Sequence, residues 1–215
     1  MNARVDHLVL AASTLDEGAR WCEATLGVVP AAGGRHVLMS THNRLLRIDG
    51  PAFPDAYFEI IAVDPQAPPP GRARWFSLDR LDLSAGPRLV GFVARVDAIE
   101  ATLLALHAAG IDAGRVWAAS RETPQGLLSW RIAVRDDGAL LFGGALPTLI
   151  EWGERHPAQA LPTSGVQLRS LTLRGLPPAA ARELALAAVR LDDTPGPALQ
   201  AQLETPLGLV TLSSA

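Results

Sequence analysis

Two residues that could act together in chemistry interrupt apolar strand patterns in the first third of the chain. His7 lies in V-D-H-L-V-L-A, and Glu59 lies in A-Y-F-E-I-I-A-V. A carboxylate is costly to bury in an apolar strand unless it is paired or coordinates a cation. Neutral imidazole and carboxylate are suitable ligands for Zn, Fe, Mn, Co or Ni. The residue types therefore indicate a divalent metal site, or a polar pocket without a metal.

A third candidate, Glu151, interrupts the L-I-E-W segment in the second half of the chain. If the two halves repeat about a pseudo-twofold axis, Glu59 and Glu151 approach the same point. The position that corresponds to His7 is then Gly91, which has no side chain. Three protein ligands and a water suffice for a catalytic metal. The predicted metal ligands are therefore His7, Glu59 and Glu151, with Glu59 or Glu151 as a catalytic general base. Pairing of each glutamate with an arginine is the structural alternative.

Other polar and aromatic residues are candidates for binding a ligand. His36, His42 and Asn43 lie around a turn between two expected strands, where they could hydrogen-bond the polar end of a small molecule. Ordinary turn chemistry is the alternative. Trp130 and Trp152 could line an apolar pocket by stacking, although a tryptophan in a core strand usually serves packing.

The elements expected to position these residues repeat the order βαβββ. In the first pass, Thr14 and Glu17 form a capping box at the start of a helix, and Gly27 ends the helix. Its strands are expected at residues 5–11, 35–40, 43–49 and 56–63. A second pass has a helix over residues 98–109 that Asp97 caps. Its strands are expected at residues 88–96, 114–119, 128–134 and 147–152. The Gly33–Gly34 pair is interpreted as turn glycines.

A third pass is one strand shorter, with its strand, helix and two further strands expected at residues 167–174, 179–189, 199–203 and 208–212. The predicted division is a βαβββ unit at 1–64, a proline-rich linker at 65–87, a second βαβββ unit at 88–160 and a partial βαββ unit at 161–215. The expected fold is α+β, with paired βαβββ units that form curved mixed or antiparallel sheets around a cleft. A generic α+β protein without a repeat is the alternative.

Composition excludes several classes of function. The 215 residues are 48% hydrophobic, which is enough to form a sizeable core. A net charge of −3 without a basic stripe argues against nucleic acid as a partner. No stretch approaches the ~20 apolar residues that span a membrane, and no signal core precedes the first strand. The single cysteine, Cys22, excludes an intrachain disulfide. We therefore expect a cytoplasmic protein without a nucleic-acid or membrane partner.

Together, these features resemble the glyoxalase-like domain of the vicinal-oxygen-chelate superfamily, which includes glyoxalases, bleomycin resistance proteins and dioxygenases. The motifs that carry the resemblance are V-D-H-L-V, G-R-H-V-L-M-S-T-H-N, Y-F-E-I-I and L-P-T-L-I-E-W. It covers residues 4–155 well and the remainder loosely. In that superfamily, four positions on opposed strands surround a divalent metal, and the matching residues here are His7, Glu59, Gly91 and Glu151. The glycine departs from the ligand pattern.

The resemblance implies a metal-dependent enzyme of the lyase, isomerase or dioxygenase type. It would act on a small oxygen-rich molecule in the cleft, with the metal as a Lewis acid on two adjacent oxygens. A metal-free protein that binds or sequesters a small molecule is the alternative, because a fold does not fix an activity, and Gly91 favours it. A structural protein with a collapsed cleft is a third hypothesis. The expected partner is a small-molecule ligand, with homodimerisation left open.

Overall fold

The first part of the chain folds as a βαβββ unit in the computed structural model, which describes residues 2–214. The predicted division also included residues 1 and 215, which lie outside the described residues. The elements of this part are β1 (Arg4–Ala11), α1 (Leu15–Leu26), β2 (Ala31–His36), the 3-10 turn η1 (Val37–Met39), β3 (Thr41–Arg47) and β4 (Tyr57–Val63).

The second part repeats this order after a connector. Its elements are η2 (Trp75–Arg80), β5 (Arg88–Arg95), α2 (Ile99–Ala108), β6 (Arg115–Thr123), β7 (Gly126–Val134), η3 (Phe142–Gly144), β8 (Thr148–Trp152) and η4 (Pro157–Gln159). The last part contains β9 (Gln167–Leu173), α3 (Pro178–Leu184), β10 (Val189–Leu191), β11 (Leu199–Thr205) and β12 (Gly208–Ser213). The short strand β10 was missed by the sequence prediction; it pairs in parallel with β9.

The ends of helix α1 follow from local sequence signals. The Thr14 side chain accepts a hydrogen bond of 3.1 Å from the Glu17 N–H, and Glu17 Oε2 accepts one from the Ser13 N–H. Gly27 ends the helix with a φ of 73°, a left-handed conformation that glycine adopts at little cost. The predicted cap by Thr14 and the predicted end at Gly27 are confirmed, whereas the Glu17 side chain bonds the N–H of Ser13 and not that of the cap residue. The prediction that Asp97 caps α2 is wrong, because the N-cap position is Ala98 and makes no side-chain cap.

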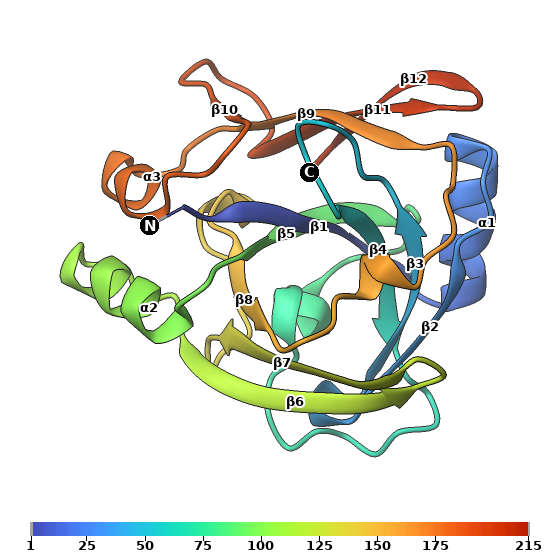
Figure 1. Ribbon diagram of the computed structural model, residues 1–215, viewed down its shortest axis with the longest axis horizontal. Coiled ribbons are helices and arrows are strands. Elements are labelled where there is room, and N and C mark those ends of the chain that lie inside the picture. Colours follow the sequence, from blue (N-terminus) through green and yellow to red (C-terminus); the bar gives the residue numbers. More distant parts are fainter. Residues whose placement is uncertain (1, 215) are drawn as a thin grey trace.

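Eight of the described strands form one curved sheet in the order β2-β3-β4-β1-β5-β8-β7-β6. The central pair, β1 and β5, is antiparallel and joins the two repeats. Each of these strands also pairs in parallel with the last strand of its own repeat, β4 or β8. The edge strands β2 and β6 contact each other, so the sheet nearly closes around an interior (Figure 1). This arrangement confirms the predicted α+β fold.

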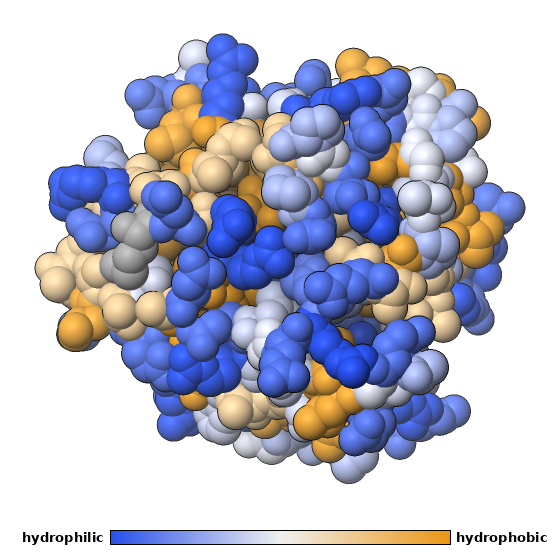
Figure 2. Space-filling model, viewed as in Figure 1, coloured by the Kyte–Doolittle hydropathy of each residue, from blue (hydrophilic) through white to orange (hydrophobic). Residues whose placement is uncertain are grey.

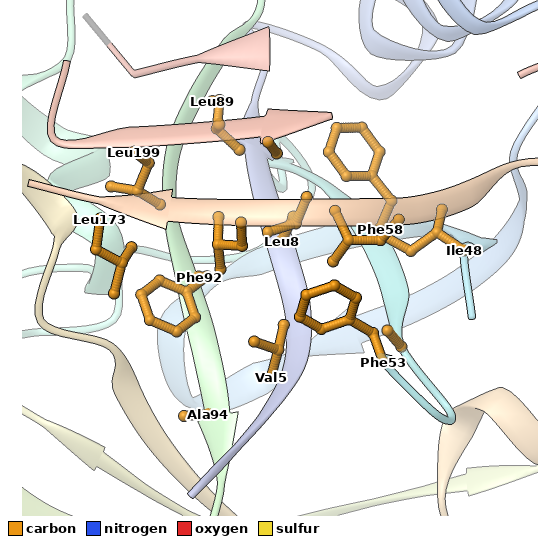
Figure 3. Close-up of a cluster of buried hydrophobic side chains, with 14 of the residues drawn as sticks. Val5, Leu8, Ile48, Phe53, Phe58, Leu89, Phe92, Ala94, Leu173 and Leu199 are labelled. Carbon is orange, nitrogen blue, oxygen red and sulfur yellow. The ribbon is translucent and has the colours of Figure 1, made fainter. Parts of the chain in front are cut away.

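The remaining four described strands form a second sheet in the order β10-β9-β11-β12. It lies over the outer face of β1 and β5, as the orange and red strands of Figure 1 show. Leu173 and Leu199 of this sheet join Leu8, Phe58 and Phe92 of the large sheet in one buried apolar cluster (Figure 3). Burial of this outer face leaves the opposite, concave face of the large sheet to form a site.

The concave face has its own apolar cluster, which includes Val9, Ile61, Trp75, Trp130 and Ile150. On the face of the molecule that Figure 2 shows, hydrophilic residues are spread across the surface and apolar residues lie between them in several groups. Among the described residues, no helix is long and apolar enough to cross a membrane.

Candidate functional site

His7 and Glu59 point into the interior of the large sheet from neighbouring strands. Strand alternation sends Tyr57, Glu59 and Ile61 of β4 to this side, while Phe58 and Ile60 pack in the outer cluster. His7 Nε2 lies 3.4 Å from Glu59 Oε2. The residues are only 4% and 5% exposed, respectively, so the two groups meet almost entirely out of solvent.

A β-bulge adds Asp6 to the same side. Between β1 and β5, Val5 lies opposite Ala94 and His7 lies opposite Val93, so Asp6 is an extra residue in β1. A bulge of this kind re-aims side chains. As a result, Asp6 Oδ1 lies 2.7 Å from His7 Nδ1, and the Asp6 side chain is fully buried. Sequence reasoning missed Asp6, although a charged residue beside a histidine in an apolar strand was a usable signal.

The other carboxylate oxygen of Asp6 is also bound. Asp6 Oδ2 accepts hydrogen bonds of 2.9 Å from Trp152 Nε1 and from His156 Nε2. The His156 Nδ1 atom accepts a hydrogen bond from the Ala158 N–H, so the ring hydrogen that faces Asp6 is on Nε2. Asp6 therefore joins β1 to β8 and to the loop that follows β8.

The contacts of His7 determine its charge. Each ring nitrogen faces a carboxylate oxygen, and an imidazole can donate from both nitrogens only as a cation. Burial alone would lower the pKa of His7, but hydrogen bonds with Asp6 and Glu59 raise it to about 9. Burial would raise the pKa of Glu59, but His7 lowers it to about 2. For Asp6, burial is outweighed by hydrogen bonds from His156 and His7, which hold the pKa well below its ordinary value. At neutral pH, His7 is thus a cation between two carboxylates.

Asn43 and His36 extend the polar group toward β2 and β3. Asn43 Nδ2 donates a hydrogen bond of 2.6 Å to Glu59 Oε1 and lies 3.2 Å from His36 Nε2. Asn43 Oδ1 accepts from the Gly34 N–H, which fixes the orientation of the amide. His36 Nε2 is therefore an acceptor, and its Nδ1 donates to Thr41 Oγ1 at 3.0 Å. Burial lowers the pKa of His36 to about 4, so this ring is neutral at neutral pH.

These side chains form one end of a small inner pocket of about 30 Å³, whose lining also includes Trp75, Phe76, Arg121, Trp130, Ile150 and Trp152. An outer cavity of about 880 Å³ adjoins it, lined mainly by residues of β2, β6 and the loop after β8. The two spaces share Leu45, Arg121, Leu128 and Pro157. The polar end of the site thus borders a larger cavity with apolar and arginine side chains.

The structure places four of the five predicted ligand-binding residues on the inner pocket. His36, Asn43, Trp130 and Trp152 line it, and the rings of the two tryptophans are 5.8 Å apart. His42 does not line it. On β3, Thr41 and Asn43 are buried and His42 alternates to the other side of the strand.

The predicted place of Glu151 needs correction. On β8, Ile150 and Trp152 line the inner pocket, and Glu151 points to the opposite face. Its Oε2 accepts a hydrogen bond of 2.9 Å from the Ile99 N–H at the start of α2, and its Oε1 accepts one of 2.7 Å from Arg131 Nη2. Glu151 thus caps the helix that Asp97 was predicted to cap.

Strand register explains this difference. In the antiparallel pair of β1 and β5, His7 lies opposite Val93 and Val9 lies opposite Gly91. A twofold rotation that brings Gly91 to the position of His7 therefore brings Val93 to the position of Val9. Val9 lies opposite Glu59, whereas Val93 lies opposite Thr148. The counterpart of Glu59 is therefore Thr148, three residues before Glu151, and an odd offset in a strand reverses the face.

The second repeat contributes no strong metal ligand at the equivalent positions. Gly91 is the counterpart of His7, and a Cβ atom at Gly91 would lie 3.4 Å from Leu140 Cδ2. An apolar side chain therefore packs where a fourth ligand would project. Within residues 2–214, no group of three or more His, Cys, Asp or Glu side chains is arranged to hold a metal ion. The residues present do not fit the three-ligand metal site predicted from the sequence.

Comparisons with known proteins identify relatives of this fold. A family model described as a glyoxalase-like domain matches residues 5–189. The crystal structure of a hypothetical protein from Staphylococcus aureus is 14% identical, with a TM-score of 0.59 over 99% of this chain and 86% of that chain. This likeness shows a shared fold.

Two methylmalonyl-CoA epimerase structures are more distant. The enzyme from Mycobacterium tuberculosis is 18% identical, with a TM-score of 0.42 over 73% of this chain and 91% of that chain. An epimerase in complex with methylmalonyl-CoA and NH4+ is 13% identical, with a TM-score of 0.44 over 71% of this chain and 94% of that chain. No curated protein sequence matches this chain.

Proposed function

The chain belongs to the glyoxalase-like domain family of the vicinal-oxygen-chelate superfamily, and on this premise we propose that it is an enzyme that moves a proton at a carbon atom beside a carbonyl group of a small oxygen-rich molecule. The observation that carries the proposal is the buried pair of His7 and Glu59 on the inner pocket, with Asp6 behind His7.

Buried charges of this kind are costly for a fold. Two charges removed from water recover the lost hydration only when their mutual geometry is good, and apolar residues of similar volume often stabilise as well. Strongly perturbed pKa values in a cleft are typical of catalytic groups. Asp6, His7 and Glu59 are all buried, and His7 and Glu59 line a pocket beside the outer cavity. We therefore infer that the buried charges of Asp6, His7 and Glu59, which are energetically unfavourable for the fold, serve the function of the protein.

The proposed step uses Glu59 as the base and His7 as the hydrogen-bond donor. Glu59 Oε2 takes a proton from carbon, and the electron pair of the broken C–H bond passes to the carbonyl oxygen as an enolate forms. The His7 Nε2–H donates a hydrogen bond to that oxygen and stabilises its negative charge. Return of the proton to carbon gives an isomer of the substrate. If the proton on Glu59 first exchanges with D2O as the solvent, the returned substrate carries deuterium.

Substrate entry would also adjust the basicity of Glu59. The contact with His7 holds the pKa of Glu59 near 2, which makes the carboxylate a weak base. A carbonyl oxygen that takes the hydrogen bond of His7 weakens this contact and raises the pKa of Glu59. Asn43 keeps its hydrogen bond to Oε1, so Oε2 is the oxygen that faces the substrate.

We assign this proton transfer to the side chains of the protein alone. Among the described residues, no group of three or more His, Cys, Asp or Glu side chains is arranged to hold the metal ion predicted from the sequence. We therefore propose a proton transfer by His7 and Glu59, and not the metal-dependent lyase, isomerase or dioxygenase reaction that the resemblance implied. The alternative, a protein that binds a small molecule without chemistry, uses the same pocket. The two functions differ in whether a bound molecule loses a proton.

Hydrogen–deuterium exchange tests the step without knowledge of the product. Pyruvate, 2-oxobutyrate, 4-methyl-2-oxopentanoate and phenylpyruvate would be incubated with the protein in D2O, and loss of their C3 protons followed by 1H NMR. These acids share adjacent oxygens and differ in the apolar tail that the outer cavity would hold. Glu59→Gln is the test variant, and Glu23→Gln, exposed on α1, is the matched control.

We expect the protein to accelerate exchange of at least one acid, and Glu59→Gln to lose about 100-fold or more of the rate, as removal of a general base does. Glu23→Gln retains the full rate. Exchange no faster than in buffer would overturn the proposal, and so would an equal rate in Glu59→Gln. Binding of an acid without exchange would instead support the ligand-binding function.

A further inference from the structure

Arg121 lies at the junction of the inner pocket and the outer cavity, and no carboxylate of the described residues forms an ion pair with it. Its side chain comes from the edge strand β6 and lines both spaces. Within the part of the chain that the structure describes, no ion pair of Arg121 is present, and its Nε atom is buried without a hydrogen-bond partner. Its one hydrogen bond is a long contact of 3.5 Å from Nη1 to Asn43 Oδ1. Burial lowers the pKa of Arg121, as expected for a cation short of partners.

The two carboxylates at the inner end of the site, in contrast, both have partners. Asp6 accepts from His7, Trp152 and His156, and Glu59 contacts His7 and Asn43. Among the described residues that line the inner pocket, Arg121 is thus the charged side chain that lacks an opposite charge at hydrogen-bond distance. A guanidinium in this state is suited to a ligand that supplies a carboxylate, because the two groups form paired charge-assisted hydrogen bonds.

Two glycines of β2 make room for this arrangement. A Cβ atom at Gly34 would lie 2.1 Å from Arg121 Nη1, and a Cβ atom at Gly33 would lie 2.1 Å from Asn43 Oδ1. Neither glycine has the positive φ that would require the residue for its backbone. The pair, which the sequence indicated as turn glycines, instead lies in a strand and provides space for Asn43 and Arg121. The position of Arg121 is therefore built into the opposite edge of the sheet.

From this geometry we infer that Arg121 is the anion-binding residue of the cleft and that the substrate class is a small 2-oxo acid. Its carboxylate would bind the Arg121 guanidinium, and its adjacent carbonyl would face His7. The apolar tail would extend into the outer cavity. This inference rests on the proposed function, because it names the substrate of the same site, but its test measures affinity and not exchange.

The test compares two ligands of similar shape that differ in charge. The probes are 2-oxobutyrate and 2,3-pentanedione, in which an acetyl group replaces the carboxylate, and their affinities would be measured by isothermal titration calorimetry. The test variants are Arg121→Gln, Arg121→Lys and Gly34→Ala. The controls are Arg20→Gln, exposed on α1, and Gly50→Ala, where a Cβ atom would meet nothing closer than 3.7 Å.

We expect Arg121→Gln to bind 2-oxobutyrate at least about tenfold more weakly, since one charge-assisted contact is lost, while affinity for 2,3-pentanedione changes less than twofold. Arg121→Lys recovers part of the loss. Gly34→Ala reproduces the loss by displacing the guanidinium, and both controls bind as the unaltered protein does. Thermal unfolding of each variant shows that the fold is retained.

Three results would overturn the inference: 2-oxobutyrate that does not bind, equal affinity in Arg121→Gln, or an equal loss for both probes. Failure of the proposed function gives a different pattern, in which 2-oxobutyrate binds through Arg121 but its C3 protons do not exchange. Exchange that survives in Arg121→Gln with unchanged affinity would overturn this inference and leave the proposed function standing.

Discussion

The Asp6 and His7 side chains face the same interior although the two residues are consecutive in a strand, and His7 Nδ1 lies 2.7 Å from Asp6 Oδ1. A regular strand would send them to opposite sides. The bulge between Val5 and His7 removes that alternation. It thereby places a buried carboxylate behind the imidazole that faces Glu59, and this contact helps to keep His7 charged.

Removal of the Asp6 charge should therefore destabilise the fold. In Asp6→Asn, the His7 cation loses a carboxylate partner, and the amide NH2 cannot accept the hydrogen bonds that Asp6 accepts. We expect the free energy of unfolding at pH 7 to fall by about 2–4 kcal/mol, measured by urea denaturation. Asp97→Asn is the control, because this side chain is 83% exposed and lies 3.7 Å from Arg4. Equal stabilities for the two variants would contradict a central role of Asp6.

Two of the buried histidines, His7 and His36, predict a stability maximum near pH 6.5. His7 has a pKa raised from 6.5 to about 9, so the folded state keeps a proton that the unfolded chain has lost between these values. Its contribution, on the order of 3 kcal/mol, is complete below pH 6.5 and is lost as the pH rises to 9. His36 has a pKa lowered from 6.5 to about 4, so stability also falls as the pH drops from 6.5 to 4.

Urea denaturation across pH 4 to 10 would measure this profile. His7→Asn should flatten the alkaline side of the profile, and His36→Asn should flatten the acidic side, relative to the unaltered protein. A profile that is flat between pH 6.5 and 9 in the unaltered protein would show that His7 does not hold its proton.

Glu151 should matter for stability and not for the ligand. Glu151→Gln loses a charged cap on α2 and the ion pair with Arg131, which together contribute about 1–2 kcal/mol. Its affinity for 2-oxobutyrate and its exchange rate should match those of the unaltered protein. Glu100→Gln is the control, because Glu100 pairs with the same arginine but its side chain is 60% exposed. Loss of exchange in Glu151→Gln with unchanged stability would restore the sequence hypothesis of a catalytic Glu151.

Chelation tests the metal directly. Among the described residues, no group of three or more His, Cys, Asp or Glu side chains is arranged to hold a metal ion. We therefore expect treatment with 10 mM EDTA followed by gel filtration to leave the exchange rate of the 2-oxo acids unchanged. Added Zn2+ or Mn2+ should not increase the rate. A loss of exchange after chelation that either ion restores would show that His7 and Glu59 act through a metal.

The sequence predicted those features that depend on short-range patterns. The capping residue Thr14 and the terminal Gly27 define α1 within a few residues. The shared face of His7 and Glu59 follows from strand alternation in two regular stretches of β1 and β4. Such patterns are local, so they are readable without knowledge of the partner strands.

The features that the sequence did not reveal depend on pairing between distant strands. Asp6 faces inward only because β5 pairs with β1 around a bulge. Glu151 faces outward because β8 pairs with β5 in a register that puts Thr148 opposite Val93. Arg121 reaches the site only because the sheet curves until β6 meets β2. Register and curvature are properties of the whole sheet, and a one-residue difference reverses a side chain.

The protonation state of His7 most directly tests whether a buried histidine cation faces Glu59 in this pocket. Long-range 1H–15N NMR of the histidine rings, assigned by comparison with His7→Asn, would follow both nitrogens of His7 from pH 5 to 10.5. We expect two protonated nitrogens at pH 7.5 and a titration midpoint near 9. A neutral ring at pH 7.5, or a midpoint at or below 6.5, would contradict a His7 cation held between Asp6 and Glu59.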